Sequence, residues 1–227
     1  MTVHGRIVNA SNHTMLVELD ADDGGVLAVY KPRDGERPLW DFPFGSLHRR
    51  EVAAFAVSDY LGWGLVPPTV LRDGPLGPGS VQLFIDHDPR RHYFVLVGEQ
   101  QHDSQLMRMA VFDLLLNNAD RKGSHVLLDA EGHVWGCDHG LTFHTEPKLR
   151  TVIWEFGGTA LPPSWSEDLV RLAHDVGADM APMRLRLLDL LDAEEVAALG
   201  ARAAGMARLA SLPDLAEDER PYPWPPV

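Results

Sequence analysis

The hydrophobic pattern of this chain changes along its length, and this change constrains the fold more than any other feature. Short β-rich runs alternate with turn residues up to about residue 85. Because β-branched and aromatic residues bounded by Gly, Pro, Asn and Asp are typical of strands, this part should form a small antiparallel sheet. The predicted strands are 6–9, 14–19 and 26–31, followed by a hairpin whose turn is 73–79.

One helix interrupts the β-rich part, and the second part of the chain is mostly helical. Apolar residues recur at helical spacing after Ser46, the predicted N-cap, and Gly62 ends that helix. Residues 104–116 predict a buried helix, because their apolar positions lie on almost every side of the helix. Helical spacing returns after residue 163. The other predicted elements are a short strand or turn at 93–97 and a hairpin of 126–128 with 133–136.

This order of elements predicts an α+β fold with two lobes. The expected parts are a β-rich N-terminal lobe with one helix (1–85), a mostly helical C-terminal lobe (86–220) and an extended Pro-rich tail (221–227). Ligands prefer clefts between such lobes, so the site is expected there.

Composition excludes several classes of protein. A net charge of −13 disfavours nucleic acids and anionic membranes, because both are bound mainly through Lys and Arg. The single cysteine, Cys137, cannot form a disulfide within the chain, and no apolar run approaches the ~20 residues of a membrane helix. The N-terminus has no signal-peptide pattern, so we expect a cytoplasmic protein.

Lys31 is the first candidate for chemistry. It ends the alternating strand LAVYK, so that Val29 and Lys31 share one face of the strand. This arrangement suits a pocket in which an apolar residue contacts a base and a cation reaches phosphate, although an exposed lysine at a strand end is the simpler interpretation. Glu51 follows in the helix and could pair with Lys31, or could be a solvated charge.

Two acidic loops give the stronger signal. Asp120 lies in NNADRKGSH directly after the predicted buried helix, and Asp138 lies in CDHG after a short hairpin. Phosphoryl transfer needs one carboxylate near the acceptor, another that holds a divalent metal, and a cation for the developing charge. The alternative is that both aspartates only cap local turns.

Five segments together resemble the catalytic domain of phosphoinositide 3-/4-kinases: VYKP, REVAAFAVSDYLGWGLVPPTV, GSVQLF, FDLLLNNADRKGSHVLL and GCDHGLTF. They are most similar to type II phosphatidylinositol 4-kinases and to HipA-like bacterial kinases, and the chain has the size of actinobacterial members. The resemblance covers about residues 5–145. It implies a two-lobed protein-kinase-like fold that binds ATP with Mg²⁺ or Mn²⁺.

The resemblance also implies residue roles. Lys31 would bind phosphate with the support of Glu51, Asp120 would be the catalytic carboxylate, and Asp138 would bind metal. The residues expected around the nucleotide are Ser11 and Asn12 in the phosphate-covering loop, Gln82, Leu83, Phe84 and Ile85 in the hinge, and Val29, Leu127 and Cys137 in the pocket.

The pattern departs from the family at the second metal ligand, where His125 replaces the usual Asn. Imidazole can bind divalent metals, but Mg²⁺ prefers oxygen, so His125 favours Mn²⁺ or a single metal. We expect an ATP-dependent kinase whose acceptor is a protein Ser/Thr, a small molecule or the chain itself rather than a lipid. The alternative is a nucleotide-binding pseudokinase that acts as a sensor or scaffold.

Overall fold

A five-stranded antiparallel sheet forms the N-terminal part of the computed structural model, which describes residues 1–7, 13–20 and 24–227. The strand order is β1-β2-β3-β5-β4. The strands are β1 (Thr2–Arg6), β2 (Met15–Leu19), β3 (Val26–Pro32), β4 (Thr69–Gly74) and β5 (Gly77–Leu83). One face of this sheet has its own small buried cluster, made of Val17, Ala28, Tyr30 and Val81.

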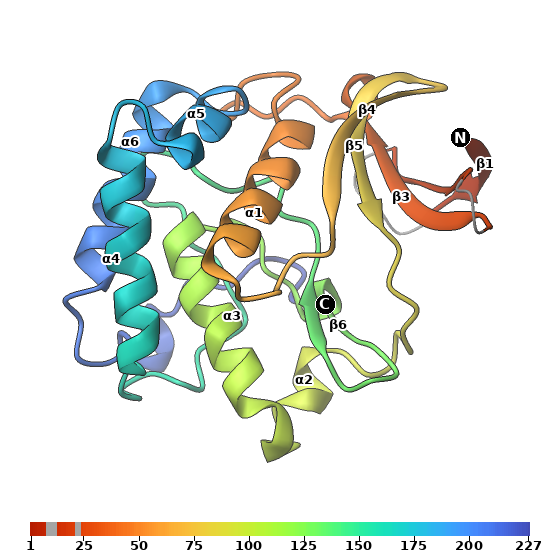
Figure 1. Cartoon of the computed structure of the whole chain (residues 1–227). Coiled ribbons are helices and arrows are strands. Elements are labelled where there is room, and N and C mark those ends of the chain that lie inside the picture. The colour runs from red at the N-terminus through yellow and green to blue at the C-terminus, as the bar shows by residue number, and fades with distance from the viewer. Residues whose placement is uncertain (8–12, 21–23) are drawn as a thin grey trace.

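Helices and a second, small sheet make up most of the remaining chain, and the α+β fold with two kinase-like lobes is confirmed (Figure 1). The helices are α1 (Leu47–Leu61), α2 (Tyr93–Leu96), α3 (Asp103–Leu116), α4 (Pro163–Gly177), α5 (Pro182–Leu188) and α6 (Ala193–Met206). β6 (Val126–Leu128) and β7 (Val134–Gly136) form the predicted hairpin. In the described part of the chain, no helix is long and apolar enough to cross a membrane.

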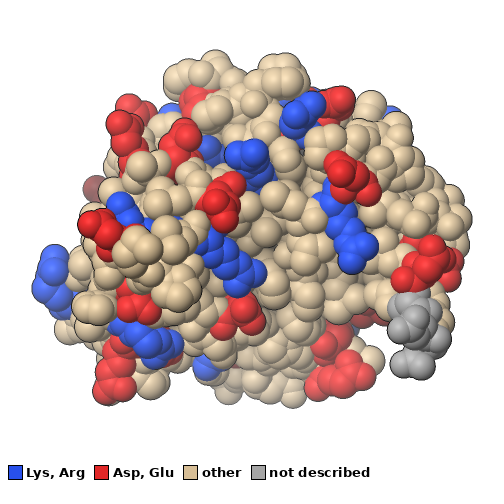
Figure 2. Space-filling view, turned by 45° about the horizontal axis from the view of Figure 1, so that its top comes forward, with Lys and Arg blue, Asp and Glu red and all other residues tan. Residues whose placement is uncertain are grey.

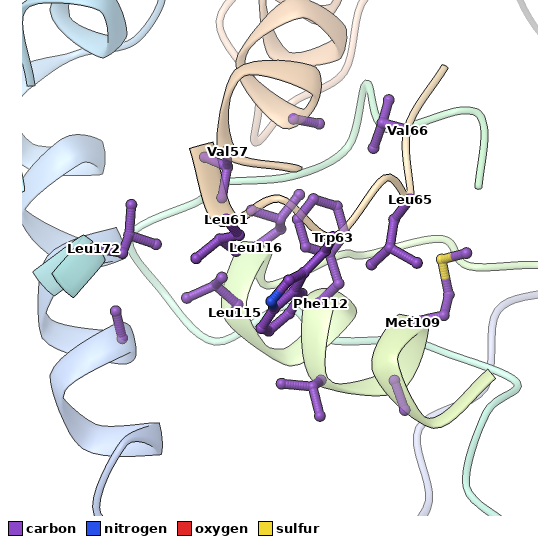
Figure 3. Packing of buried hydrophobic residues seen from close by; sticks show 14 of the residues in the cluster. Val57, Leu61, Trp63, Leu65, Val66, Met109, Phe112, Leu115, Leu116 and Leu172 are labelled. Atoms are coloured by element: carbon purple, nitrogen blue, oxygen red, sulfur yellow. The ribbon is translucent and has the colours of Figure 1, made fainter. Parts of the chain in front are cut away.

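The main core joins α1 to the helices that follow it. Figure 3 shows Trp63, just after α1, against Phe112 of α3, with ring centroids 6.4 Å apart. Leu61 and Leu172 belong to the same buried cluster, which therefore extends to α4. Helix α1 is thus packed as part of the helical core, although its sequence position lies between strands.

Arg50 ties α1 to the C-terminal part through polar contacts. Its side chain is fully buried, and the guanidinium donates to Thr142 O and to Glu195 Oε1, both at 2.6 Å. Phe42 covers the guanidinium, with 5.0 Å to its ring centroid. A buried cation needs such partners, and here they hold α1 against α6 and against the segment after the CDHG loop.

The N-terminus of α1 is capped differently from the prediction. Ser46 occupies the N-cap position, but its side chain makes no capping bond and its hydroxyl donates to Pro43 O (2.7 Å). The carboxylate of Glu36 accepts from the N–H groups of Leu47 (3.2 Å) and His48 (2.9 Å) instead. A carboxylate at this position also interacts favourably with the helix dipole, so a residue ten positions upstream of Ser46 replaces the local cap.

We predict that Glu36→Ala lowers the free energy of unfolding by about 1–2 kcal/mol, as expected for the loss of a helix cap. Its hydrogen bonds with His48 lower the pKa of Glu36 against the effect of burial, so the stabilisation exists above the unfolded pKa and is lost as pH falls through the folded pKa. Urea unfolding at neutral and acid pH measures both effects. Asp34→Ala, in the same loop but exposed, is the control; an equal loss in the two variants would contradict the capping role.

Two other predictions were wrong in detail. Residues 93–97 predicted a strand or turn, but α2 is helical there because Tyr93 and Leu96, three residues apart, both face the core and the Tyr93 hydroxyl donates to Glu155. β1 spans Thr2–Arg6 and pairs Thr2 with Glu18 and Arg6 with Met15, so it begins four residues before the predicted strand 6–9, of which residues 8 and 9 lie outside the described residues. The domain boundary at residue 85 stays a prediction.

Candidate active site

Lys31, Glu51 and Asp138 converge on one point, although they come from a strand, a helix and a loop far apart in the sequence. Lys31 Nζ donates to Glu51 Oε1 and to Asp138 Oδ1, the latter at 2.9 Å. Glu51 Oε2 accepts the N–H of His139 at 3.0 Å. The helix carboxylate therefore holds both the lysine and the backbone that follows Asp138.

The charges of Lys31 and Asp138 are fixed near neutral pH, whereas burial raises the pKa of Glu51. Burial alone would lower the pKa of Lys31, but Asp138 and Glu51 raise it above its ordinary value. In turn, the Lys31 ammonium holds the pKa of Asp138 well below its usual range. The site therefore presents a protonated amine beside an ionised carboxylate, as a phosphate- and metal-binding site requires.

The loop around Asp138 is shaped by a buried ion pair that the sequence analysis missed. Arg121 and Asp113 are both fully buried, and Arg121 Nη2 lies 2.9 Å from Asp113 Oδ1. The same guanidinium donates to Cys137 O (3.0 Å) and to His139 Nε2 (2.7 Å). The pair thus joins the loop of Asp120 to the loop of Asp138. A single Asp inside the apolar run of α3 was the signal, because a buried charge needs a partner.

The backbone at Asp138 lies in the left-handed region, with φ 59°. A residue other than glycine rarely adopts this conformation, and such strain is often found at functional sites. Here the contacts of Lys31 and Arg121 on either side of the loop stabilise it.

Asp120 and His125 flank Asp138 without contacting each other directly. Asp120 Oδ2 lies 3.1 Å from Lys122 Nζ, and burial raises the pKa of this carboxyl. His125 Nε2 lies 3.4 Å from Asp138 Oδ2, and burial lowers the pKa of His125 to about 4, so the ring is neutral at pH 7. His125 Nδ1 accepts the Lys122 N–H at 3.4 Å. Metal ligation by Nε2 would require the ring proton to move to Nδ1.

One cavity of about 380 Å³ contains the residues predicted to surround a nucleotide. Those that line it are Val29, Gln82, Leu83, Phe84, Ile85, Leu127 and Cys137, together with Lys31, His125 and Asp138. Ser11 and Asn12 lie outside the described residues, so their predicted contact with phosphate is left as a prediction.

The backbone hydrogen bonds show which residue of the predicted hinge has an N–H group left for a ligand. The Leu83 N–H donates to Pro68 O (2.8 Å) and the Phe84 N–H donates to Leu27 O (3.0 Å), while Gln82 is paired within the sheet. Of the four hinge residues, Ile85 is the one whose N–H has no bond to any described residue. Its N–H is therefore the group available for the edge of a base.

A second cavity, of about 460 Å³, meets the first at Lys31 and Asp138, which line both. Asp120 and Glu51 line the second cavity and not the first. The predicted catalytic carboxylate therefore lies beyond the Lys31–Asp138 pair as seen from the first cavity.

The donor set at Asp138 fits a divalent cation that also binds phosphate. Among the described residues, no group of three or more His, Cys, Asp or Glu side chains is placed to hold a metal. Asp138 and His125 supply one carboxylate and one imidazole 3.4 Å apart, and Mg²⁺ or Mn²⁺ commonly takes its remaining ligands from substrate phosphates and water.

The chain has a β-rich lobe with one helix, a helical lobe, and a lysine and an aspartate shared by two cavities, with a second aspartate in one of them. These features define a protein of the kinase-like class. The sequence model described as phosphatidylinositol 3- and 4-kinase matches residues 72–183, which include Asp120 and Asp138. Protein Rv2133c of Mycobacterium tuberculosis (strain ATCC 25618 / H37Rv) is 39% identical over 258 aligned positions, which cover 99% of this chain and 91% of the relative. This chain belongs to the phosphatidylinositol 3- and 4-kinase family, as its motifs indicated.

Proposed function

We propose that this protein is an ATP-dependent kinase that transfers the γ-phosphate to a hydroxyl acceptor. The observation that supports it most is the arrangement of the two cavities, which share Lys31 and Asp138 while Asp120 lines only the second. A base and ribose fit the first cavity, the phosphates lie at the shared residues, and the acceptor enters the second.

Each residue has a defined task in this reaction. Lys31 binds the phosphates, and Glu51 fixes its ammonium group. The acceptor oxygen attacks the γ-phosphorus, the bond from that phosphorus to the bridging oxygen breaks, and ADP leaves with the bond electrons. Asp120 orients the acceptor hydroxyl and receives its proton, and the raised pKa of this carboxyl suits a base.

Asp138 and His125 would hold the metal. A bound Mg²⁺ or Mn²⁺ would neutralise charge on the phosphates during transfer. The Lys31 contact with Asp138 Oδ1 leaves Oδ2, the oxygen that faces His125, for this role.

The test compares ATP binding in the native protein and in Lys31→Met. A ligand at 100 times its Kd adds ~2.7 kcal/mol of stability, which corresponds to a rise in Tm of about 5–10 °C for a chain of this size. We expect ATP with Mg²⁺ or Mn²⁺ to produce such a rise in the native protein and little rise in Lys31→Met, each relative to its own Tm without ligand.

Arg72→Met, which removes a cation from an edge strand of the same sheet, is the matched control and should keep the full ATP response. An undiminished response in Lys31→Met would contradict the placement of the phosphates. Labelled-phosphate transfer then separates the two candidate activities: ATP binding without transfer to protein, small molecules or water would identify a nucleotide-binding pseudokinase.

A further inference from the structure

The second cavity has a chemical character that phosphate transfer alone does not require. Its floor is apolar, because Phe42, Leu47 and Ala119 form a buried cluster with Leu141 packed against it. Five basic side chains also line the cavity, and so do five carboxylates: Lys31, Arg37, Lys122, Lys148 and Arg150 on one side, and Glu36, Asp41, Glu51, Asp120 and Asp138 on the other. An apolar floor beside a cation that is left unpaired favours a ligand that has both an apolar part and an anionic group.

Most of the charged side chains in the cavity are paired with one another. The chain has a net charge of −13, and on the face seen in Figure 2 basic side chains lie beside acidic ones without forming a broad basic area. Within the cavity, Lys122 pairs with Asp120 and Lys148 with Asp41 (3.2 Å). The Arg150 guanidinium has no hydrogen bond or ion pair to any described residue, so it is the cation available to an anion.

Two tryptophans border the same cavity and are almost completely exposed. Trp40 is 91% exposed and Trp224 is 89% exposed. Indole rings normally bury much of their large apolar surface, so two of them left open beside one cavity indicate stacking surfaces for a ligand. Lys148 already lies over Trp40, with 4.8 Å from Nζ to the ring centroid, whereas Trp224 has no ring contact with a described residue.

The position of Trp224 is held by the chain on both sides of it. Pro226 O accepts the Gly123 N–H (2.8 Å) and Pro221 O accepts the Thr151 N–H (3.2 Å). Pro223 is buried, and the prolines restrict the backbone further. The tail follows α6 in the sequence, but Figure 1 shows that it ends beside β6, well away from the α6 label. The tail therefore returns to the loop of Asp120 and carries Trp224 to the cavity.

On the basis of the proposed kinase function, we infer that the acceptor is a small anionic molecule with an alcohol and a ring, and that Trp224 and Arg150 determine this specificity. The ring stacks on Trp224 over the apolar floor, Arg150 binds the anion, and the alcohol faces Asp120. A volume of about 460 Å³ is in the range of sites for small molecules, which favours them over a folded protein surface.

The probe for this inference is 4-nitrophenyl phosphate, which has the ring and the anion but no alcohol to be phosphorylated. Isothermal titration should show binding to the native protein, and an affinity about tenfold lower in Trp224→Ala and in Arg150→Ala. Met180→Ala and Arg208→Ala, which remove an exposed apolar and an exposed basic side chain outside both cavities, should bind the probe as the native protein does. Equal affinity in all five proteins, or no binding to any, would overturn the inference.

Further titrations test the ring and the anion of the ligand one at a time. Inorganic phosphate and neutral 4-nitrophenyl β-D-glucoside should each bind more weakly than the probe. If inorganic phosphate binds as tightly as the probe, the ring is not required; if the glucoside does, the anion is not required. Displacement of the probe by phosphatidylcholine vesicles containing phosphatidic acid, but not by glycerol 3-phosphate, would overturn the assignment to a small molecule.

The same samples are tested for the rise in Tm with ATP. If the native protein shows no rise, the proposed kinase function fails. If the rise in Tm depends on Lys31, but the affinity for the probe is the same in Trp224→Ala and Arg150→Ala as in the native protein, only the acceptor assignment fails.

Discussion

Asp113→Asn should lower the free energy of unfolding by about 3–5 kcal/mol, since breaking a buried ion pair leaves the partner charge uncompensated. Arg121 would keep its positive charge in a fully buried position after the change. It would also lose the geometry that directs it to Cys137 O and His139 Nε2. Urea unfolding followed by tryptophan fluorescence measures the loss.

A double variant shows whether the cost comes from the orphaned charge. Asp113→Leu with Arg121→Met replaces both partners by apolar side chains and should recover much of the stability, because neither charge is then buried. Arg90→Ala removes one partner of an exposed pair with Asp88 and should have no measurable effect. An Asp113→Asn protein as stable as the native one would show that this pair does not stabilise the loops.

Asp120→Asn should reduce ATP-dependent phosphate transfer by about 10²–10⁴-fold, the usual contribution of a positioned acid or base. Its affinity for ATP should stay close to native, because Asp120 lines the second cavity and not the first, in which we propose that the nucleotide binds. Single-turnover transfer of labelled phosphate, to the chain itself or to water, measures the rate, and the rise in Tm with ATP measures binding.

Glu131→Gln is the control for Asp120→Asn, because it neutralises an exposed carboxylate in the nearby β6–β7 turn outside both cavities. It should transfer phosphate at the native rate. Transfer that survives in Asp120→Asn would remove this residue from its proposed role, whereas loss of ATP binding together with transfer would show that Asp120 acts on the nucleotide instead.

The sequence predicted those parts of the fold that depend on local pattern. The alternation of LAVYK placed Val29 and Lys31 on one face of β3, and both line the first cavity. The Gly/Pro turn at 73–79 and the turn after Leu128 were predicted as hairpins, because those residues favour the backbone conformations of turns. The approach of Lys31 to Asp138 followed from the family resemblance.

Features that depend on distant packing could not be read from the sequence. YFVLV has strong β-propensity, yet Tyr93 and Leu96 are helical because tertiary contacts outweigh that preference. The cap of α1 comes from Glu36, which no local capping pattern identifies. The second cavity combines residues from the start, middle and end of the chain, including Trp40, Arg150 and Trp224, so only the folded chain reveals it.

The buried contacts of Arg50 also bear on the position of Lys31. Because Arg50 joins α1 to Glu195 and to Thr142 O, the position of the next residue, Glu51, is set by the helical lobe. Glu51 in turn holds the ammonium group of Lys31 at the end of β3. Two successive residues of one helix thus connect the strand lysine to the far end of the helical core, and a change that displaces Arg50 would also displace the partner of Lys31.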